Sequence, residues 1–324
     1  MNIVLVGAGQ IGSRHLQGLA LLKEDNIRIQ VLDPSEDSLR IARDRFYEIA
    51  KDKNNISIEF ISNFNEVVND VNVAIVATSS KVRRTAIEEL VQGRSIKYLL
   101  LEKFLFSDIR DYEVIQNLIN EKQIKAFVNC PRRLYPDYIE IKDLLKDQKN
   151  FIFNAVGSNW GLGCNGIHLL DLFCFFTETK ELRLNNDWLD EEVIPSKRAG
   201  YVEFSGTITG TNNGSKFLIT SYPSGNSPLV ISMFNENFRI LIEEGSGTYF
   251  YSSVSNGWAW EQKKFTIKFQ SQLTNLVVEE LVATGTCGLT AYEESAYLHH
   301  SFLKNILSFI ERTQGKKTTE CLIT

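Results

Sequence analysis

The sequence lacks several features that define whole classes of protein. No apolar stretch approaches the roughly 18 residues of a membrane-spanning helix, and no block of lysine or arginine is longer than a pair. The N-terminus has neither the basic segment nor the cleavage site of a secretory signal. Together with a net charge of −5, these absences argue against a membrane span and against nucleic acid or an anionic membrane surface as a partner.

Cysteine is also scarce. The five cysteines are odd in number and no two are spaced as CxxC, so the sequence predicts no disulfide framework and favours a reducing compartment, the cytoplasm. Internal repeats and low-complexity tracts are missing too. The remaining composition, 43% hydrophobic and 23% charged residues, is that of an ordinary globular protein. A length of 324 residues predicts two domains.

The N-terminal part alternates between short apolar runs and stretches with helical periodicity. Runs typical of strands buried on both faces lie at 3–6, 27–32, 58–61, 72–77, 98–101 and 126–128. Helices are expected after the first run and at 34–50, 81–92 and 108–122. This alternation with short links predicts a doubly wound parallel sheet in an α/β domain, which we place at 1–125.

The pattern changes from about residue 151. Two-residue periodicity predicts strands at 151–156, 201–209, 216–222, 229–234, 238–243, 248–253 and 265–269. Turn-rich links between these strands indicate a mainly antiparallel sheet, and helices are expected at 165–176 and 289–312. We assign this second, α+β domain to 126–324.

The segment GAGQIG follows the first apolar run and opens the first predicted helix. Gly7 permits a tight turn, Gly9 has no side chain to block a pyrophosphate, and Gly12 lets the helix pack closely on the strand. Together with Gln10 and Ile11, these glycines begin a helix whose free N–H groups favour an anion. The spacing predicts a dinucleotide-binding turn; the alternative is a turn that binds nothing.

Asp33 stands at the end of the second predicted strand. A carboxylate there can accept hydrogen bonds from both hydroxyls of an adenosine ribose and would repel a 2′-phosphate, so NAD is favoured over NADP. His15 follows the glycine turn, and we expect a helix-side histidine with a local hydrogen bond rather than a catalytic group.

Polar residues follow two further strands at the edge of the sheet where a cofactor crevice is expected. Thr78 and Ser79 follow one strand, and Glu102 and Lys103 follow the next, so all four are candidate cofactor contacts. Lys103 is also a candidate catalytic residue, because its ammonium group can polarise a substrate oxygen. The alternative is a surface lysine paired with Glu102.

The helix predicted at 165–176 carries a second group of reactive side chains. His168 and Asp171 share a helix face, so His168 is a candidate to exchange an alcohol proton while Asp171 orients it. One alternative is a core histidine satisfied by Asp171. The other is a metal site with Cys164 and Cys174, but the outer members of this row lie too far apart to close on one ion.

Several residues are candidate substrate contacts. Asn159 and Trp160 precede this helix and are the amide and aromatic types that line sugar sites, and Cys164 and Asp171 on the helix join them. Arg133 lies in the segment PRRLYP; for this arginine the alternative is a role at an interdomain hinge.

Four motifs, in this order, resemble those of the Gfo/Idh/MocA oxidoreductases, which include glucose–fructose oxidoreductase and inositol dehydrogenase: VGAGQIGSRHLQGL, EKF, RRLYP and GIHLLDL. The resemblance extends to the ending ECLIT. It implies a Rossmann domain followed by a domain with a large open sheet, whose exposed face makes homodimers or homotetramers. It also implies NAD(P)-dependent oxidation or reduction of small sugars, cyclitols or their derivatives, with the family's lysine at Lys103 and its histidine at His168.

Three positions depart from the family's pattern. Phe104 stands where the family has a proline after the lysine, which predicts the loss of a cis turn. Cys164 stands where an aspartate is common, and Arg83 ends a segment that carries a proline and a histidine in the family. These changes concern the acid–base arrangement more than cofactor binding.

The hypothesis from the sequence is a cytoplasmic, NAD-dependent dehydrogenase of a sugar or cyclitol. One alternative is a reductase or dehydrogenase of a nucleotide-linked sugar in the synthesis of surface polysaccharide. Another is a non-catalytic dinucleotide-binding sensor, for which the departures at Phe104, Cys164 and Arg83 leave room.

Overall fold

The computed structural model describes residues 1–50, 55–146 and 148–324, which form two compact units. Unit 1 comprises Met1–Phe106, Arg110–Pro131 and Lys268–Ser295, and unit 2 comprises Ser107–Ile109, Arg132–Ile267 and Ala296–Thr324. The two units therefore do not follow a single cut in the sequence. Residues 268–295, which the sequence analysis assigns to the second domain, fold with unit 1.

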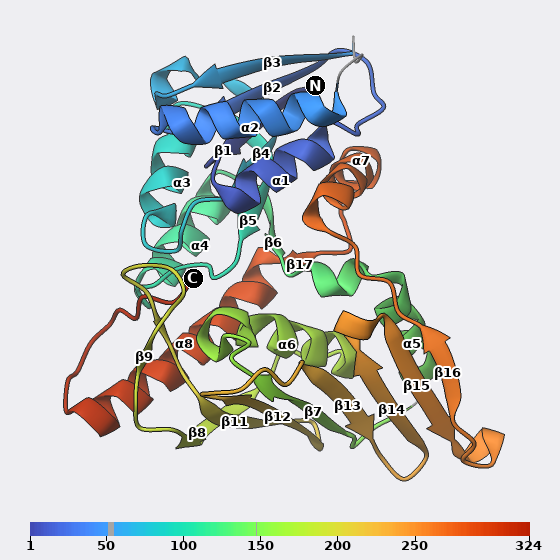
Figure 1. Cartoon of the computed structure of the whole chain (residues 1–324). Coiled ribbons are helices and arrows are strands. Elements are labelled where there is room, and N and C mark those ends of the chain that lie inside the picture. Colours follow the sequence, from blue (N-terminus) through green and yellow to red (C-terminus); the bar gives the residue numbers. More distant parts are fainter. Residues whose placement is uncertain (51–54, 147) are drawn as a thin grey trace. The chain divides into compact units, whose positions relative to one another are not determined.

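Unit 1 is built on a seven-stranded sheet with the order β17-β6-β5-β4-β1-β2-β3 (Figure 1). Its parallel strands are β1 (Asn2–Val6), β2 (Ile27–Leu32), β3 (Ile56–Ile61), β4 (Asp70–Val76), β5 (Ser95–Glu102) and β6 (Lys125–Asn129). The short strand β17 (Thr290–Ala291) pairs antiparallel with β6. Ile3, Val4 and Leu5 of the central strand β1 are fully buried, as expected of a strand that is covered on both faces.

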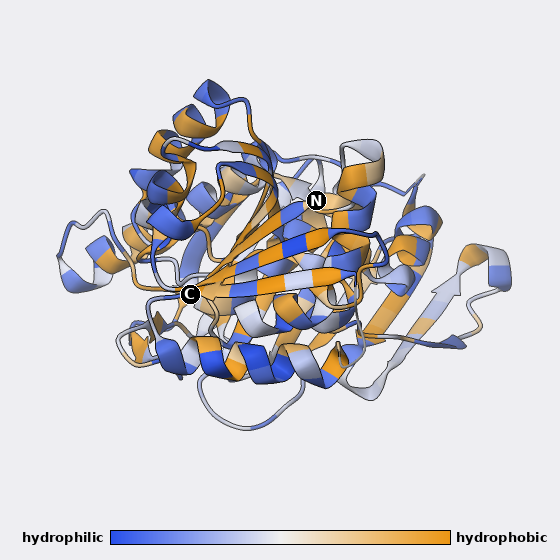
Figure 2. Cartoon of the chain, turned by 90° about the horizontal axis from the view of Figure 1, so that it is seen from above, coloured by the Kyte–Doolittle hydropathy of each residue, from blue (hydrophilic) through white to orange (hydrophobic). Residues whose placement is uncertain are grey.

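The helices of unit 1 are α1 (Gln10–Leu19), α2 (Glu36–Ile49), α3 (Arg83–Val91), α4 (Asp111–Glu121) and α7 (Thr274–Thr284). Helix α2 is typical: it buries Leu39, Ala42 and Phe46, and the Ser35 hydroxyl caps its start by accepting a hydrogen bond from the Ser38 amide (3.2 Å). Figure 2 shows largely hydrophobic strands beside helices that mix hydrophobic and hydrophilic residues. The predicted doubly wound sheet is confirmed.

Unit 2 contains an eight-stranded sheet with the order β16-β15-β14-β13-β7-β12-β11-β8. Its strands are β7 (Ile152–Ser158), β8 (Arg183–Leu189), β11 (Gly206–Asn212), β12 (Ser215–Tyr222), β13 (Val230–Phe234), β14 (Phe238–Glu243), β15 (Thr248–Ser253) and β16 (Glu261–Lys264). Neighbouring strands are antiparallel except for β7 and β12, which are parallel. A separate small hairpin joins β9 (Ile194–Pro195) to β10 (Val202–Glu203).

Helix α6 (Leu162–Thr177) lies along one face of this sheet (Figure 1). A Cβ atom at Gly166 would lie 3.0 Å from Phe302 of α8 (Tyr292–Gln314) and 3.3 Å from Ile219 of β12, so the three elements pack directly on one another. No described helix covers the opposite face, where the strand register places Ile152 and Trp188, which are 41% and 65% exposed. The expectation of a large open, mainly antiparallel sheet is confirmed.

The sequence analysis misplaced some elements. Residues 265–269 were predicted as a strand, but the strand is β16, and Phe265 packs its ring against Tyr138 with centroids 4.9 Å apart. The predicted strand at 201–209 is divided between β10 and β11. Helices α5 (Pro136–Leu145) and α7 and the edge strand β8 were missed. Strand β8 was missed because its sequence, RLNNDWL, is mostly polar. Such a sequence is tolerated because β8 is an edge strand that pairs on one side only.

Candidate functional site

The glycine turn between β1 and α1 combines two packed glycines with an open one. Gly7 has a φ of +95°, and a Cβ atom at this position would lie 3.0 Å from the backbone of Ala77 and Thr78. At Gly12 a Cβ atom would lie 1.8 Å from the Gly7 carbonyl oxygen, whereas at Gly9 it would meet nothing within 4 Å. Packing therefore requires glycine at 7 and 12, while the space beside Gly9 is open to a ligand.

The first turn of α1 is bare. No side chain of the described residues caps it, and it contains no acidic residue. The residues that open the helix, Gln10 and Ile11, are both exposed. The first N–H groups of a helix have no partner within it and carry a partial positive charge, so this end of α1 is suited to an anion.

Asp33 connects this turn to the end of β2. Its Oδ2 accepts a hydrogen bond from the Ala8 amide (2.7 Å), and its Oδ1 accepts one from the Ser35 amide (2.8 Å). Each carboxylate oxygen can accept a second hydrogen bond. The half-buried Asp33 thus holds the glycine turn in place and keeps acceptor capacity for ribose hydroxyls.

The loop after β4 lies against the same turn. The Thr78 amide nitrogen is one of the atoms that a Cβ atom at Gly7 would touch, and Thr78 and Ser79 are both half-buried. Their predicted contacts to a cofactor stay predictions. The structure nevertheless brings the loop after β4 and the glycine turn together, as the sequence analysis requires.

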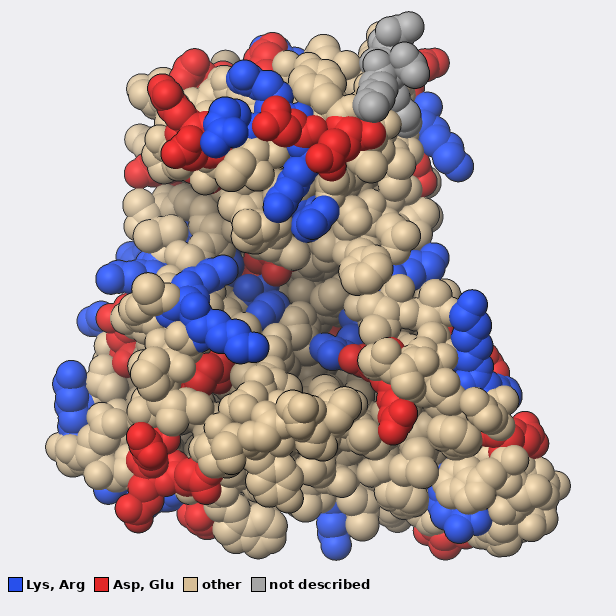
Figure 3. Space-filling view, viewed as in Figure 1, with Lys and Arg blue, Asp and Glu red and all other residues tan. Residues whose placement is uncertain are grey.

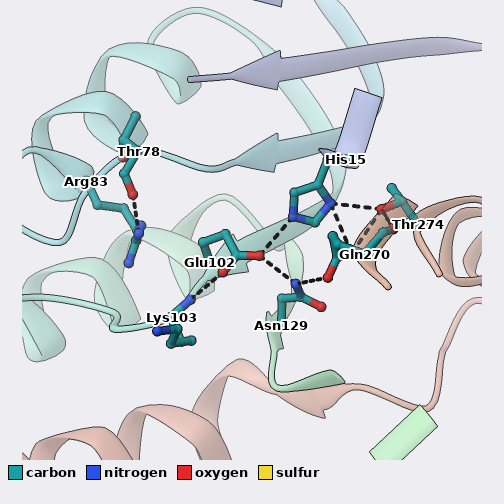
Figure 4. A network of polar contacts seen from close by, with 8 residues as sticks. All are labelled: His15, Thr78, Arg83, Glu102, Lys103, Asn129, Gln270 and Thr274. Carbon is teal, nitrogen blue, oxygen red and sulfur yellow. Dashed lines mark hydrogen bonds and ion pairs between the residues drawn. The ribbon is translucent and has the colours of Figure 1, made fainter. Parts of the chain in front are cut away.

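Arg83 holds this loop, a role that the sequence analysis missed. The side chain is 1% exposed, and its guanidinium donates a hydrogen bond to the Thr78 carbonyl oxygen (Figure 4). It also donates to the carbonyl oxygens of Phe104 and Leu105. Arg83 therefore joins the loop after β4 to the segment that follows Lys103. Arg83 is thus a buried clamp between these two segments.

Glu102 and His15 form the centre of a buried network in unit 1 (Figure 4). His15 Nε2 lies 2.8 Å from Glu102 Oε1, and His15 Nδ1 lies 3.0 Å from the Thr274 hydroxyl. The Asn129 amide donates to both Glu102 Oε1 (2.5 Å) and Gln270 Oε1 (2.7 Å). The partners of His15 are thus far away in the sequence, and the expectation of a local hydrogen bond was wrong.

The network determines the charge of Glu102. Burial would by itself raise the pKa of this carboxyl, but the hydrogen bond and charge of His15, the Asn129 amide and the charge of Lys103 outweigh burial. The pKa of Glu102 therefore lies below its ordinary value of 4.5. An ionised carboxylate is fixed next to Lys103, whose own amide donates to Glu102 Oε2 (3.2 Å).

Lys103 directly follows β5 and is half-buried, and its catalytic role stays a prediction. The peptide bond between Lys103 and Phe104 is cis. The expectation that the loss of proline removes the cis turn was therefore wrong.

Unit 2 contains a cavity of about 510 Å³ beside the start of α6. Three predicted substrate residues, Asn159, Trp160 and Cys164, line it. Two of them are held by backbone: the Trp160 ring N–H donates to the Thr220 carbonyl (2.7 Å), and the Asn159 amide donates to the Gly225 carbonyl (2.9 Å). The cavity thus has a fixed aromatic ring and a fixed amide in its wall.

Glu203 is a further residue of this wall that the sequence analysis missed. It comes from β10 and is 8% exposed. Its carboxylate caps α6, because Oε2 accepts from the Gly163 amide (2.7 Å) and Oε1 accepts from the Cys164 amide (3.1 Å). The sequence carried no signal for this contact, since Glu203 lies 40 residues beyond the helix start that it caps.

The remaining candidates lie on or near α6. His168 is half-buried. Asp171, which is 1% exposed, accepts a hydrogen bond from Arg133 Nε at Oδ2 (2.6 Å), and Arg133 Nη2 donates to the Asp171 carbonyl oxygen (3.2 Å). The carboxylate that the sequence analysis assigns to His168 is thus bound by Arg133. Substrate contacts of Arg133 and Asp171, and the orienting role of Asp171, stay predictions.

No group of three or more His, Cys, Asp and Glu side chains in the described ranges is arranged to hold a metal ion. No helix in the part of the chain that the structure describes is both long and apolar enough to cross a membrane.

Unit 1 therefore has the fold and turn of a Rossmann-type dinucleotide-binding protein: a parallel sheet, a bare helix start behind a glycine turn, and an acid at the end of β2. Residues 1–130 match the family model described as "Oxidoreductase family, NAD-binding Rossmann fold". Over these residues the chain is similar to the Gfo/Idh/MocA oxidoreductases.

Solved structures share the fold over nearly the whole chain. UDP-N-acetylglucosamine 3-dehydrogenase GnnA from Acidithiobacillus ferrooxidans is 13% identical, with a TM-score of 0.68 over 94% of this chain and 96% of its own. A Gfo/Idh/MocA family oxidoreductase from Vibrio cholerae is 15% identical, with a TM-score of 0.70 over 98% and 100%. The transcriptional regulator Gal80p from Kluyveromyces lactis is 13% identical, with a TM-score of 0.69 over 96% and 92%. No curated protein matches the sequence.

Proposed function

We propose that the protein is an oxidoreductase that uses a nicotinamide dinucleotide and acts on a sugar, a cyclitol or a sugar derivative. The observation that carries this proposal is the bare start of α1 beside Gly9, with the Asp33 carboxylate fixed against the same turn. This arrangement offers N–H groups to a diphosphate and acceptors to a ribose.

The residues of unit 1 fit such a cofactor. The amides of Gln10, Ile11 and Gly12 would hold the diphosphate, Asp33 the adenosine ribose, and Thr78 and Ser79 a later part of the molecule. Bound there, the cofactor supplies a carbon that accepts or donates hydride. We propose NAD over NADP, because a 2′-phosphate would face the Asp33 carboxylate.

Lys103 and His168 carry the acid–base chemistry in this proposal. The ionised Glu102 lies beside Lys103, and the ammonium group of Lys103 polarises a substrate oxygen and stabilises negative charge on it. The His168 imidazole takes up or returns the hydroxyl proton.

The cavity in unit 2 supports an uncharged polyhydroxylated ring as the substrate. Trp160 and the 54% exposed Tyr222 offer ring faces, and the buried carboxylate of Glu203 lies in the same wall. Lys197 is the one basic residue among the described residues of the wall. A buried carboxylate opposed by a single exposed lysine disfavours the two phosphates of a nucleotide-linked sugar.

We also propose a cytoplasmic homodimer or homotetramer that forms through the uncovered face of the unit 2 sheet. The exposed Ile152 and Trp188 on that face support this assembly, and the odd set of cysteines without CxxC supports the compartment.

The test is a two-stage binding and turnover measurement. Calorimetry with NAD⁺ and NADP⁺ should show binding, with NAD⁺ the tighter ligand. A panel of hexoses, cyclitols and nucleotide sugars should then reveal a substrate by a change in NADH absorbance. K103M and H168A should each lower turnover by orders of magnitude and leave NAD⁺ affinity mostly intact, while K97M, at an exposed lysine of β5, should leave turnover unchanged. Near-normal turnover in K103M and H168A would contradict the assigned roles.

A dinucleotide-binding regulator is the second candidate, supported by the structural likeness to Gal80p. If NAD⁺ raises the unfolding temperature but no compound in the panel changes NADH absorbance, the regulator is favoured over the enzyme.

A further inference from the structure

Arg45 of helix α2 extends to the first turn of α1. Its Nη2 donates a hydrogen bond to Gln10 Oε1 (3.0 Å), and its Nη1 donates to the Ser13 hydroxyl. The Ser13 hydroxyl in turn donates to the Gln10 carbonyl oxygen (3.1 Å), and Ser13 itself is buried. The guanidinium is therefore held at a fixed place beside the turn that contains Gly9 and Gln10.

This guanidinium has no acidic partner among the described residues. Over α2, acidic and basic side chains gather on the surface (Figure 3), and Arg40 pairs with Asp37 of the same helix. Arg45 is half-buried, yet it forms no ion pair with any carboxylate of residues 1–50, 55–146 or 148–324, including Asp44 and Glu48 of its own helix. A partly buried cation without a counter-charge is expected to attract an anion.

The position of Arg45 indicates which anion this is. Its two contacts are on the first turn of α1, where the bare N–H groups already favour negative charge. Neither contact is with Asp33, Pro34 or Ser35 at the end of β2, where a ribose would lie. The guanidinium thus adds its charge to the diphosphate end of the turn and not to the ribose end.

We propose that Arg45 is a cofactor-binding residue that neutralises the diphosphate of the dinucleotide, with Gln10 and Ser13 positioning its guanidinium. This inference rests on the proposed dinucleotide-binding function. It gives the turn a charged group that the motif GAGQIG does not contain.

Calorimetry with NAD⁺ and NADP⁺, repeated over a range of NaCl concentrations, tests this role. R45Q should weaken both ligands by about tenfold, which is about 1.4 kcal/mol, and should flatten the dependence of affinity on salt, because one cation–phosphate contact is lost. R45K should keep most of the affinity and the salt dependence. The control R43Q removes a guanidinium of the same helix that lies 4.7 Å from the Phe60 ring centre, and should bind as the unmodified protein does.

The outcomes separate the inference from the function on which it rests. Normal affinity and normal salt dependence in a folded R45Q would overturn the role of Arg45 alone. A loss confined to NADP⁺ would also overturn it, because Arg45 would then bind a 2′-phosphate. Absence of any binding by the unmodified protein would overturn the proposed function and this inference together. Unfolding temperatures of all variants show whether each is folded.

Discussion

The same substitution at two glycines of one turn should have opposite effects on stability and binding. We expect G12A to destabilise the protein, because the new methyl group would lie 1.8 Å from the Gly7 carbonyl oxygen and 2.8 Å from its carbon. We expect G9A to leave stability unchanged, because the methyl group meets nothing within 4 Å and the backbone φ of −62° suits alanine. G9A should instead weaken dinucleotide binding, since its methyl group enters the space beside the bare amides.

The magnitudes follow from packing. Overpacking of a tight site costs about 1–3 kcal/mol, and a clash with backbone belongs at the upper end. Alanine in a helix interior recovers about 1 kcal/mol relative to glycine, so the net loss for G12A is about 2 kcal/mol. For a unit of about 150 residues this lowers the unfolding temperature by about 4–8 °C. G9A should stay within about 0.5 kcal/mol of the unmodified protein and lose at least about tenfold in NAD⁺ affinity.

Differential scanning calorimetry measures the first effect, and isothermal titration with NAD⁺ measures the second. A G12A protein as stable as the unmodified one would refute the packing argument for the turn. A G9A protein that binds NAD⁺ with full affinity would refute the proposed location of the diphosphate. Because the two glycines differ only in their surroundings, each variant is the control for the other.

Three further outcomes are expected. R83M leaves the carbonyls of Thr78, Phe104 and Leu105 without their buried donor. It should lower the free energy of unfolding by about 3 kcal/mol or more and speed hydrogen exchange at 78–80 and 104–106. Unchanged exchange would contradict the role of Arg83 as a clamp. Because the pKa of Glu102 is lowered in the folded protein, its ionised carboxylate stabilises the fold above pH 4.5. This stabilisation is lost as the pH falls through the lowered pKa of the folded state. E102Q should therefore flatten the fall of the unfolding temperature below about pH 4, while E89Q, at an exposed glutamate, should not. W160A should weaken sugar binding by about tenfold and W188A should not; equal effects would argue against the cavity.

The sequence predicted well the features that depend on neighbouring residues. The strands of unit 1 were found because each is a short apolar run, and the glycine turn because its spacing follows a strand and opens a helix. The open antiparallel sheet of unit 2 was also predicted from neighbouring residues, in this case from two-residue periodicity. Strand β8 was missed because its polar side chains lack that periodicity.

The parts of the site that depend on long-range contacts were not predictable in this way. From the sequence, Arg83 was only a position where the family pattern has a histidine. Its role depends on carbonyl oxygens about 20 residues further along the chain. Glu203 lies in a run that resembled an ordinary strand, and its function as a cap requires the hairpin of β9 and β10 to meet α6. His15 appeared local because its partners Glu102 and Thr274 come from distant segments.

Residues 268–295 come late in the sequence but fold with unit 1, and this has a practical consequence for protein engineering. A fragment that stops at Pro131 would omit Thr274, whose side chain fills the space that Gly18 leaves on α1, where a Cβ atom would lie 2.7 Å away. It would also omit Gln270 and the edge strand β17. A minimal cofactor module should therefore join residues 1–131 to 268–295 through a linker. Such a fusion would restore every partner of His15 within a single short gene.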